Sequence, residues 1–433
     1  MAFDNDELNK RREEREQERK IAESQNKLLK IGLIVTAVTL VLCGAALLVT
    51  YGVVNFPAQQ DPDLQVPPST SESEPTEQTE PTPQVPDQVI HFVAGGDLNV
   101  TDKTVAAGTA VSGYDYTSVF MDVASILSRA DLAALNFEGS LFGAPYGTEH
   151  KSAPIQMVQA LRNAGVDLLQ TANSQSVVNG LSGLRSTLQA IRSSGMEPLG
   201  AYATPEEFRE SGGFIIRNVQ GIRVAIVAFT KGMDGMGLPD GNEDCVNLLY
   251  KDYNSAYQKV DTQGIKAILQ DIRAQKPDVT IALLHWGSEY NSKTSATQDT
   301  ITKLMLEQGV DAIIGSHSHY VQKAVFDRDK GTLVAYSLGD FFGDAQNAGT
   351  DYSILLDLEI TKNGKTGACK ITGVECIPIF TLDETETGGG MRVVRIREAM
   401  AAYENNYISK ISEKAYLAMK NAIEKITPRM ELS

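Results

Sequence analysis

The chain has 433 residues, of which 42% are hydrophobic and 22% charged, and its formal net charge is −16 at pH 7. This composition provides enough apolar residues for a large core. The strongly acidic balance argues against a DNA- or RNA-binding surface, so we expect no nucleic-acid partner.

The first 54 residues predict a single-pass membrane anchor. Residues 31–54 carry no charge and, at about 1.5 Å per helical residue, are long enough to cross a hydrocarbon core of about 30 Å. Residues 1–30 are rich in Lys and Arg, whereas no such residue follows the span until Lys103. This asymmetry predicts a cytoplasmic N-terminus, a signal anchor retained in the cell membrane, and an extracellular location for the rest of the chain.

Residues 55–88 predict a disordered linker. The segment holds eight of the sixteen prolines, and the residues between them are mostly Ser, Thr, Gln and Glu. Such a composition cannot bury enough apolar surface to offset the cost of ordering, and repeated proline keeps the chain extended. We therefore expect a stalk that carries the following domain through the cell envelope.

From residue 89 onward, short apolar runs alternate with amphipathic segments, which predicts an α/β domain over residues 89–382. The expected strands are Val89–Ala94, Leu132–Asn136, Val166–Thr171, Val224–Phe229, Thr280–His285, Ala312–Gly315 and Thr332–Ser337. The expected helices are Ala153–Ala164, Gly183–Ser194, Thr262–Gln275 and Ala296–Gln308. Two later strands, Tyr352–Ile360 and Lys370–Phe380, are separated by a turn signal and are expected to complete a second sheet.

The C-terminal extension, residues 383–433, contains a helical pattern over Glu398–Lys425. Three cysteines follow the predicted membrane span, and their spacing resembles no zinc ribbon. Cys369 and Cys376 fall in neighbouring strand candidates, where a disulfide between them is geometrically possible.

Polar residues stand where several predicted strands end. The first strand runs into Asp97 and Asn99, the second into Asn136 and Glu138, and the third into Asn173. Three of the chain's five histidines occupy similar positions, namely His285, His317 and His319. Because an α/β sheet places its chemistry at such strand ends, we expect these side chains to meet in one site.

Mixed oxygen and nitrogen ligands suit Mn, Fe or Zn better than Ca²⁺, so one or two divalent ions are the expected cofactor. Two such ions about 3.5–4 Å apart activate water toward phosphate esters in other enzymes. Serine-based catalysis is the alternative chemistry, but Ser316 lacks the glycine two residues later that a nucleophile elbow requires.

These motifs resemble those of the CapA-type poly-γ-glutamate capsule synthesis proteins (PGA_cap domain), a branch of the calcineurin-like metallophosphoesterase superfamily. The resemblance covers Val89 to Gly343, and the motifs occur in the family's order: Gly96-Asp97, Asn136-Phe137-Glu138-Gly139, Ala172-Asn173, His285-Trp286-Gly287-Ser288-Glu289-Tyr290, Gly315-Ser316-His317-Ser318-His319 and Tyr336-Ser337-Leu338-Gly339-Asp340-Phe341. It implies a four-layer α/β/β/α sandwich with the site at the strand ends. It also implies a membrane-anchored protein that works outside the cell in the synthesis or export of an anionic polymer.

Taken with the strand-end pattern, the resemblance gives each site residue an expected role. The expected metal ligands are Asp97, Asn99, Glu138, His285, His317 and His319. The expected catalytic positions are Asn173 and Gln175, and the expected substrate contacts are Asn136, Ser174, Trp286, Glu289 and Tyr290.

The third motif departs from the family pattern, which reads Ala-Asn-Asn-His followed three residues later by Asp. This chain has Ser174, Gln175 and Val178 at the last three of these positions, so the metal-bridging Asn and the catalytic His are missing. A carboxamide does not titrate, and Gln175 therefore cannot serve as a proton donor. Asp340 replaces an Asn of the family. Asn99 replaces a Met, at a position where the wider superfamily often carries a histidine ligand.

The sequence is compatible with two functions. The missing Asn and His favour an accessory subunit of a capsule or poly-γ-glutamate-type synthesis complex, with a partly degenerate metal site. The retained pair His317 and His319 favours an active metal-dependent phosphoesterase, or a hydrolase or transferase, acting on an envelope polymer or a lipid-linked phosphate. In both cases the expected partners are the membrane, the envelope polymer and other membrane-bound subunits of polymer synthesis or export.

Overall fold

The computed structural model describes residues 86–383, 390–405 and 411–432. The predicted cytoplasmic segment 1–30, the membrane span 31–54 and nearly all of the linker 55–88 lie outside the described residues. Within the described part of the chain, no helix combines the length and apolar character needed to cross a membrane. The membrane anchor therefore stays a prediction from the sequence.

An eight-stranded mixed sheet is built around β1 (Gln88–Asn99). Its parallel side continues through β2 (Leu132–Glu138), β3 (Leu168–Gln170) and β4 (Glu197–Leu199). Its antiparallel side continues through β12 (Tyr352–Lys362), β13 (Cys369–Leu382) and β14 (Arg392–Arg395). The short strand β11 (Asp340–Phe342) pairs in parallel with the end of β1.

The second sheet has seven strands and is also mixed. In spatial order they are β15 (Met430–Glu431), β9 (Ala324–Asp327), β10 (Thr332–Ala335), β8 (Ala312–Ser316), β7 (Val279–His285), β6 (Ile222–Thr230) and β5 (Ile215–Val219). The central strands β6, β7, β8 and β10 run parallel to one another. Their carboxyl ends therefore lie along one edge of the sheet, as the sequence predicts for a site.

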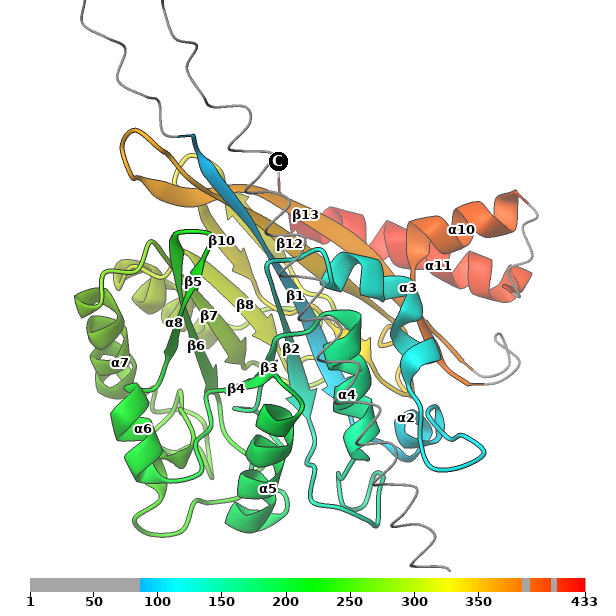
Figure 1. Cartoon of the computed structure of the whole chain (residues 1–433), viewed down its shortest axis with the longest axis horizontal. Coiled ribbons are helices and arrows are strands. Elements are labelled where there is room, and N and C mark those ends of the chain that lie inside the picture. The colour runs from blue at the N-terminus through cyan, green and yellow to red at the C-terminus, as the bar shows by residue number, and fades with distance from the viewer. Residues whose placement is uncertain (1–85, 384–389, 406–410, 433) are drawn as a thin grey trace, which may run out of the picture. The chain divides into compact units, whose positions relative to one another are not determined.

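Alternate residues of β1 face two different cores, as the two-residue period of a strand requires. Ile90 and Phe92 belong to a core that also contains Ile226 and Leu283 of the second sheet. Val93 belongs to a separate core formed with helices α3 (Thr117–Leu127) and α4 (Ile155–Ala164). The two sheets thus pack against each other, and helices cover the outer face of the first one (Figure 1).

Helices also cover the outer face of the second sheet. Ile265 of α7 (Thr262–Ala274) and Ile301 of α8 (Ala296–Glu307) pack with Val227 and Ala282. The remaining helices of the domain lie in connections and are α2 (Asp102–Ala106), α5 (Gly180–Ser193), α6 (Pro205–Ser211) and the 3₁₀ turn Glu243–Cys245. The fold is accordingly α/β with two mixed sheets.

The strands predicted at Tyr352–Ile360 and Lys370–Phe380 form the hairpin β12–β13, but the expectation that this hairpin completes a second sheet is wrong. β12 pairs antiparallel with β1, from Gln88 opposite Lys362 to Ala94 opposite Leu356. The hairpin therefore extends the first sheet. A local pattern predicts a strand well but does not identify the strand it pairs with.

The disulfide considered between Cys369 and Cys376 is excluded. Both residues lie on the single strand β13, seven positions apart, which corresponds to roughly 23 Å at about 3.3 Å per residue. A disulfide requires Cα atoms within about 7 Å. Both thiols are free.

The C-terminal extension packs on the domain. In place of the one helix expected over Glu398–Lys425 there are two, α10 (Ile396–Glu404) and α11 (Glu413–Ile426), which lie beside β13 (Figure 1). Their buried residues Ala399, Met419 and Ala422 join the core between the two sheets. These helices thus enlarge the core on the antiparallel side of the first sheet.

Gly96 allows a close approach of two backbones next to the site. A Cβ atom at this position would lie 1.8 Å from the carbonyl oxygen of Gly339, which accepts a hydrogen bond from the Asp97 N–H at 2.9 Å. We predict that Gly96→Ala lowers the free energy of unfolding by about 3 kcal/mol, the upper range for overpacking. Denaturant titration would measure the change.

Gly237→Ala provides the matched control, because its Cβ would come no closer than 3.5 Å to a neighbouring atom. Equal stability of the two variants would contradict the close approach described for Gly96.

Candidate metal centre

The strand register brings the polar strand ends of each sheet together. In the first sheet, Asp97 of β1 is opposite Asn136 of β2 on one side and Asp340 of β11 on the other. Asn99 is opposite Glu138 two pairs further along. In the second sheet, His285 is the last residue of β7 and lies opposite Ser316, the last residue of β8. His317 follows Ser316 directly in the chain. Both sheets thus present their strand ends to the same site.

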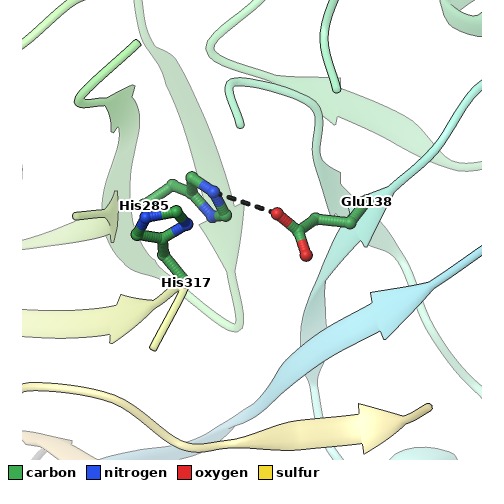
Figure 2. Close-up of side chains that lie close together, drawn as sticks. All are labelled: Glu138, His285 and His317. Atoms are coloured by element: carbon green, nitrogen blue, oxygen red, sulfur yellow. Dashed lines mark ion pairs between the residues drawn. The ribbon is translucent and has the colours of Figure 1, made fainter. Parts of the chain in front are cut away.

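The first group of candidate ligands consists of Glu138, His285 and His317, whose ligand atoms lie within 4.8 Å of one another. His285 Nε2 is 3.0 Å from Glu138 Oε1, and the ring centroids of the two histidines are 4.4 Å apart. Figure 2 shows the Glu138 carboxylate directed at the His285 ring, with the His317 ring beside His285. All three side chains are buried.

The second group consists of Asp97, His319 and Asp340, again within 4.8 Å of one another and buried. His319 Nδ1 is 2.8 Å from Asp340 Oδ1 and 3.9 Å from Asp97 Oδ2. Asp97 also links this group to the first, because its Oδ2 accepts the backbone N–H of His317 at 2.9 Å and its Oδ1 lies 4.0 Å from His285 Nδ1. The two groups are therefore adjacent.

The loop after β8 has an unusual backbone conformation. His317 has a φ of 91° and His319 a φ of 59°. Residues other than glycine rarely adopt positive φ, and such conformations persist only where the surrounding structure holds them. One such constraint is the hydrogen bond from the Tyr290 N–H to the Ser318 carbonyl, 2.9 Å long. The turn aims both imidazoles into the site.

Burial shifts the pKa of each group in this centre. Desolvation raises the pKa of Asp97 to about 6 and that of Glu138 to about 7. It lowers the pKa of His285 to about 4 and holds that of His317 well below its usual value. Burial alone would also lower the pKa of His319, but the neighbouring carboxylates, Asp340 foremost, outweigh burial and raise it to about 11.

The residues present fit a divalent transition metal. Two imidazoles of the first group, His285 and His317, are neutral, which is the form that donates to a metal. Three carboxylates, those of Asp97, Glu138 and Asp340, are 6% exposed or less. Buried carboxylates are stable only when paired or bound to cations, and a donor set of imidazole nitrogen and carboxylate oxygen suits Mn, Fe or Zn.

Asn136 and Asn173 form a buried amide chain behind the ligands. The Asn136 amide donates to Asp97 Oδ1 at 2.6 Å, and the Asn173 amide donates to Asn136 Oδ1 at 3.0 Å and to the Phe137 carbonyl at 2.7 Å. Asn173 Oδ1 in turn accepts the backbone N–H of Gln175. These hydrogen bonds orient Asp97 through Asn136.

Ser174 lies inside the first group, whereas Gln175 lies at the rim. Ser174 is 1% exposed, and its Oγ is 3.0 Å from His285 Nε2 and 3.4 Å from His317 Nδ1. The side chain of Gln175 turns away and donates to Asp234 Oδ2 at 3.1 Å. Of these two substituted positions, only Ser174 thus contacts the candidate ligands directly.

A polar cleft with a volume of about 120 Å³ opens beside the second group. Its walls include Asn99, Lys151, Glu289 and Tyr290 next to His319. The Tyr290 ring is half exposed and stacks on the His319 imidazole, with centroids 5.1 Å apart. Asn99 lies near the ligands, its Nδ2 being 3.5 Å from His319 Nδ1. Because Glu138, Asp340 and Asp344 also line it, the cleft is mainly acidic, and a small polar group could reach the candidate centre through it.

Trp286 lies in the core and away from the cleft. It is fully buried, its indole N–H donates to the Tyr336 carbonyl at 2.9 Å, and its ring stacks on that of Tyr336. It also packs against Gly315, where a Cβ atom would lie 2.4 Å from the indole nitrogen. These contacts hold the ends of β7 and β8 together. The predicted substrate contacts Glu289 and Tyr290 line the cleft instead.

Two residues of the site were not assigned by the sequence. Asp340 belongs to a family motif, where it replaces an Asn, but the sequence gives it no role; in the structure it completes the second group. Lys231 directly follows β6, and its Nζ lies 3.3 Å from His317 Nε2 and donates to the Gly287 carbonyl at 3.0 Å. The strand-end rule that singled out His285 applies equally to Lys231 and could have identified it.

Comparison with known proteins places the sequence among capsule synthesis proteins. The family described as bacterial capsule synthesis protein PGA_cap matches residues 91–345. The capsule biosynthesis protein CapA of Bacillus anthracis is 28% identical over 58% of this chain, and the match spans 59% of that relative's length. The PGA biosynthesis protein CapA of Bacillus subtilis is 24% identical over 67% of this chain and 72% of its own.

Two solved structures of phosphoesterases match the chain at low similarity. A phosphatase from Mycoplasma pneumoniae shares 15% identity over 68% of this chain and 94% of its own, with a TM-score of 0.43. The calcineurin-like phosphoesterase YfkN of Bacillus subtilis shares 14% identity over 79% of this chain and 98% of its own, with a TM-score of 0.40.

The amide chain behind the ligands yields a prediction. Asn173→Ala would leave Asn136 Oδ1 and the Gln175 N–H without their partner, at about 1–3 kcal/mol for each unsatisfied group, whereas the Phe137 carbonyl would keep the Gly139 N–H as a donor. We expect the metal-free protein to lose about 3 kcal/mol of unfolding free energy, measured by denaturant titration. Gln175→Ala, which removes only an exposed contact, should change it by less than about 0.5 kcal/mol. Similar losses in both variants would refute the role given to the amide chain.

Proposed function

Because this chain belongs to the PGA_cap family of bacterial capsule synthesis proteins, we propose that it takes part in the biosynthesis or export of a capsule or related anionic exopolymer of the poly-γ-glutamate type. The names of the Bacillus relatives support this assignment. The protein would be held in the cell membrane by residues 31–54, with residues 55–433 outside the cell. Its partners would be other membrane-bound subunits of polymer synthesis or export and the envelope polymer itself.

We further propose that the protein binds metal, because two adjacent groups of potential ligands lie at the strand ends. One divalent ion would be held by Glu138, His285 and His317, and a second by Asp97, His319 and Asp340. Asn99 borders the second group. Such a metal acts as a Lewis acid, which polarises a carboxylate or phosphoryl oxygen bound to it. A four-layer metallophosphoesterase-like architecture is the expected framework for this centre.

The chain's own residues favour an accessory role over hydrolysis. A proton donor is absent at Gln175, because a carboxamide does not titrate. The side-chain amide of Asn173 donates its hydrogen bonds to Asn136 Oδ1 and to the Phe137 carbonyl, so it is not free to donate to a substrate. Glu289 and Tyr290 line the cleft and would orient a polymer group at the centre. We therefore propose a metal-binding subunit that holds an anionic polymer.

An active metal-dependent phosphoesterase, or a hydrolase or transferase of an envelope polymer or lipid-linked phosphate, is the second candidate. The observation in its favour is that each ligand group brings three potential donors together despite the altered third motif, although His319 would have to release a proton to bind a metal. Lys231 beside His317 adds a cation that could help to bind an anionic substrate. Turnover decides between the two candidates.

The proposed centre should bind metal. We expect the full-length purified protein to bind roughly one or two Mn, Fe or Zn ions, detected by elemental analysis. Metal at about 100 times its Kd should raise the melting temperature by about 5 °C. His317→Ala should weaken binding by at least about 100-fold, more than loss of an outer-shell partner costs.

His91→Ala is the matched control for His317→Ala. His91 lies at the other end of β1, where its Nδ1 pairs with Asp357 at 2.9 Å. This variant should bind metal as the wild type does. Absence of Mn, Fe and Zn from the wild-type protein, together with an unchanged melting temperature on their addition, would remove the metal centre from the account.

The accessory role predicts no metal-dependent turnover. With saturating metal, we expect hydrolysis of bis(p-nitrophenyl) phosphate and of poly-γ-glutamate to stay at the level of His317→Ala, because the centre lacks a proton donor at Gln175. The polymer should nevertheless bind to the metal-loaded wild type. Metal-dependent turnover that disappears in His317→Ala would instead establish the phosphoesterase or hydrolase reading.

A further inference from the structure

The last residues of the described chain lie against the loop that carries His317 and His319. Helix α11 leads into a 3₁₀ turn, Thr427–Arg429, and then into β15. β15 pairs in parallel with β9, with Met430 opposite Ala324. The Arg429 guanidinium donates from Nη1 to the carbonyl oxygen of Val321, two residues after His319.

This contact supports one side of a loop that would not hold its shape alone. His317 and His319 both have positive φ, a conformation that costs about 1–3 kcal/mol at each such residue. On the other side, Tyr290 donates to Ser318, and the side-chain amide of Gln322 donates to the Asn291 carbonyl at 2.7 Å. Arg429 thus completes the support from the opposite direction.

The support is itself firmly anchored. Met419, Ala422 and Ile426 of α11 are buried in the core between the sheets. Val321, whose carbonyl accepts the Arg429 bond, is fully buried, and it forms an antiparallel bridge with Leu338 just before β11. The C-terminal segment that contacts the His317–His319 loop is therefore packed firmly on the domain.

We infer that Arg429 is a positioning residue for the candidate metal centre, which acts through the backbone of the His317–His319 loop. The inference rests on the proposed metal binding. It also gives the C-terminal extension a role, because Arg429 lies outside the segment matched by the family, residues 91–345. Loss of the guanidinium should loosen the loop and weaken metal binding, while leaving the remainder of the fold unchanged.

The test compares Arg429→Met with the wild type in the full-length protein. Methionine keeps an apolar stem but removes the donors. By hydrogen exchange of the metal-free protein, we expect amides of residues 317–323 to exchange about tenfold faster, with no change in α3 or β2. By titration, Mn²⁺ or Zn²⁺ should bind about tenfold more weakly, as for other outer-shell partners. Arg429→Lys, which keeps one donor, should recover part of both effects.

Arg328→Met is the matched control. The exposed Arg328 guanidinium donates to the Thr372 carbonyl at 3.1 Å, away from the loop, so neither measurement should change. Unchanged exchange of residues 317–323 in Arg429→Met would overturn the inference, and so would faster exchange spread over the whole domain. If the wild type binds no metal, the proposed function fails, whereas the exchange measurement still decides whether Arg429 positions the loop.

Discussion

The site depends on the hydrogen bonds that the buried carboxylate of Asp97 accepts. Asp97 sits on β1 in the middle of the first sheet, yet its Oδ2 accepts the backbone N–H of His317 from the second sheet. Its Oδ1 accepts the amide of Asn136. With no exposed surface, this carboxylate needs compensating partners. The two ligand groups meet around it, and so the register of β1 with β2 and β11 decides whether the centre exists.

Much of the fold and of the site follows from the sequence. The strands leading to Asp97, Glu138, His285 and His317 were predicted from apolar runs, and the rule that parallel strands place chemistry at their carboxyl ends then grouped these residues correctly in space. The motif set also identified the family. Such buried central strands are recognisable as continuous apolar runs, because both of their faces are covered and nearly every residue along them is apolar.

The remaining features depend on contacts that sequence spacing does not encode. The pairing of β12 with β1 follows from the tertiary arrangement, which a local pattern cannot specify. Trp286 stands within a site motif, but its indole points into the core, and only the structure distinguishes the two directions. Asp340 reaches the second group through its pairing with Asp97 across β11 and β1, 243 positions along the chain.

The most direct measurement is the anomalous X-ray scattering of crystals of the protein equilibrated with Mn²⁺ or Zn²⁺, recorded at the absorption edge of the metal. We predict one or two peaks in the space bounded by Asp97, Glu138, His285 and His317, with the first group of ligands around one of them. If crystals equilibrated with the metal show no peak there, or show peaks only at surface carboxylates, that result would contradict the metal centre.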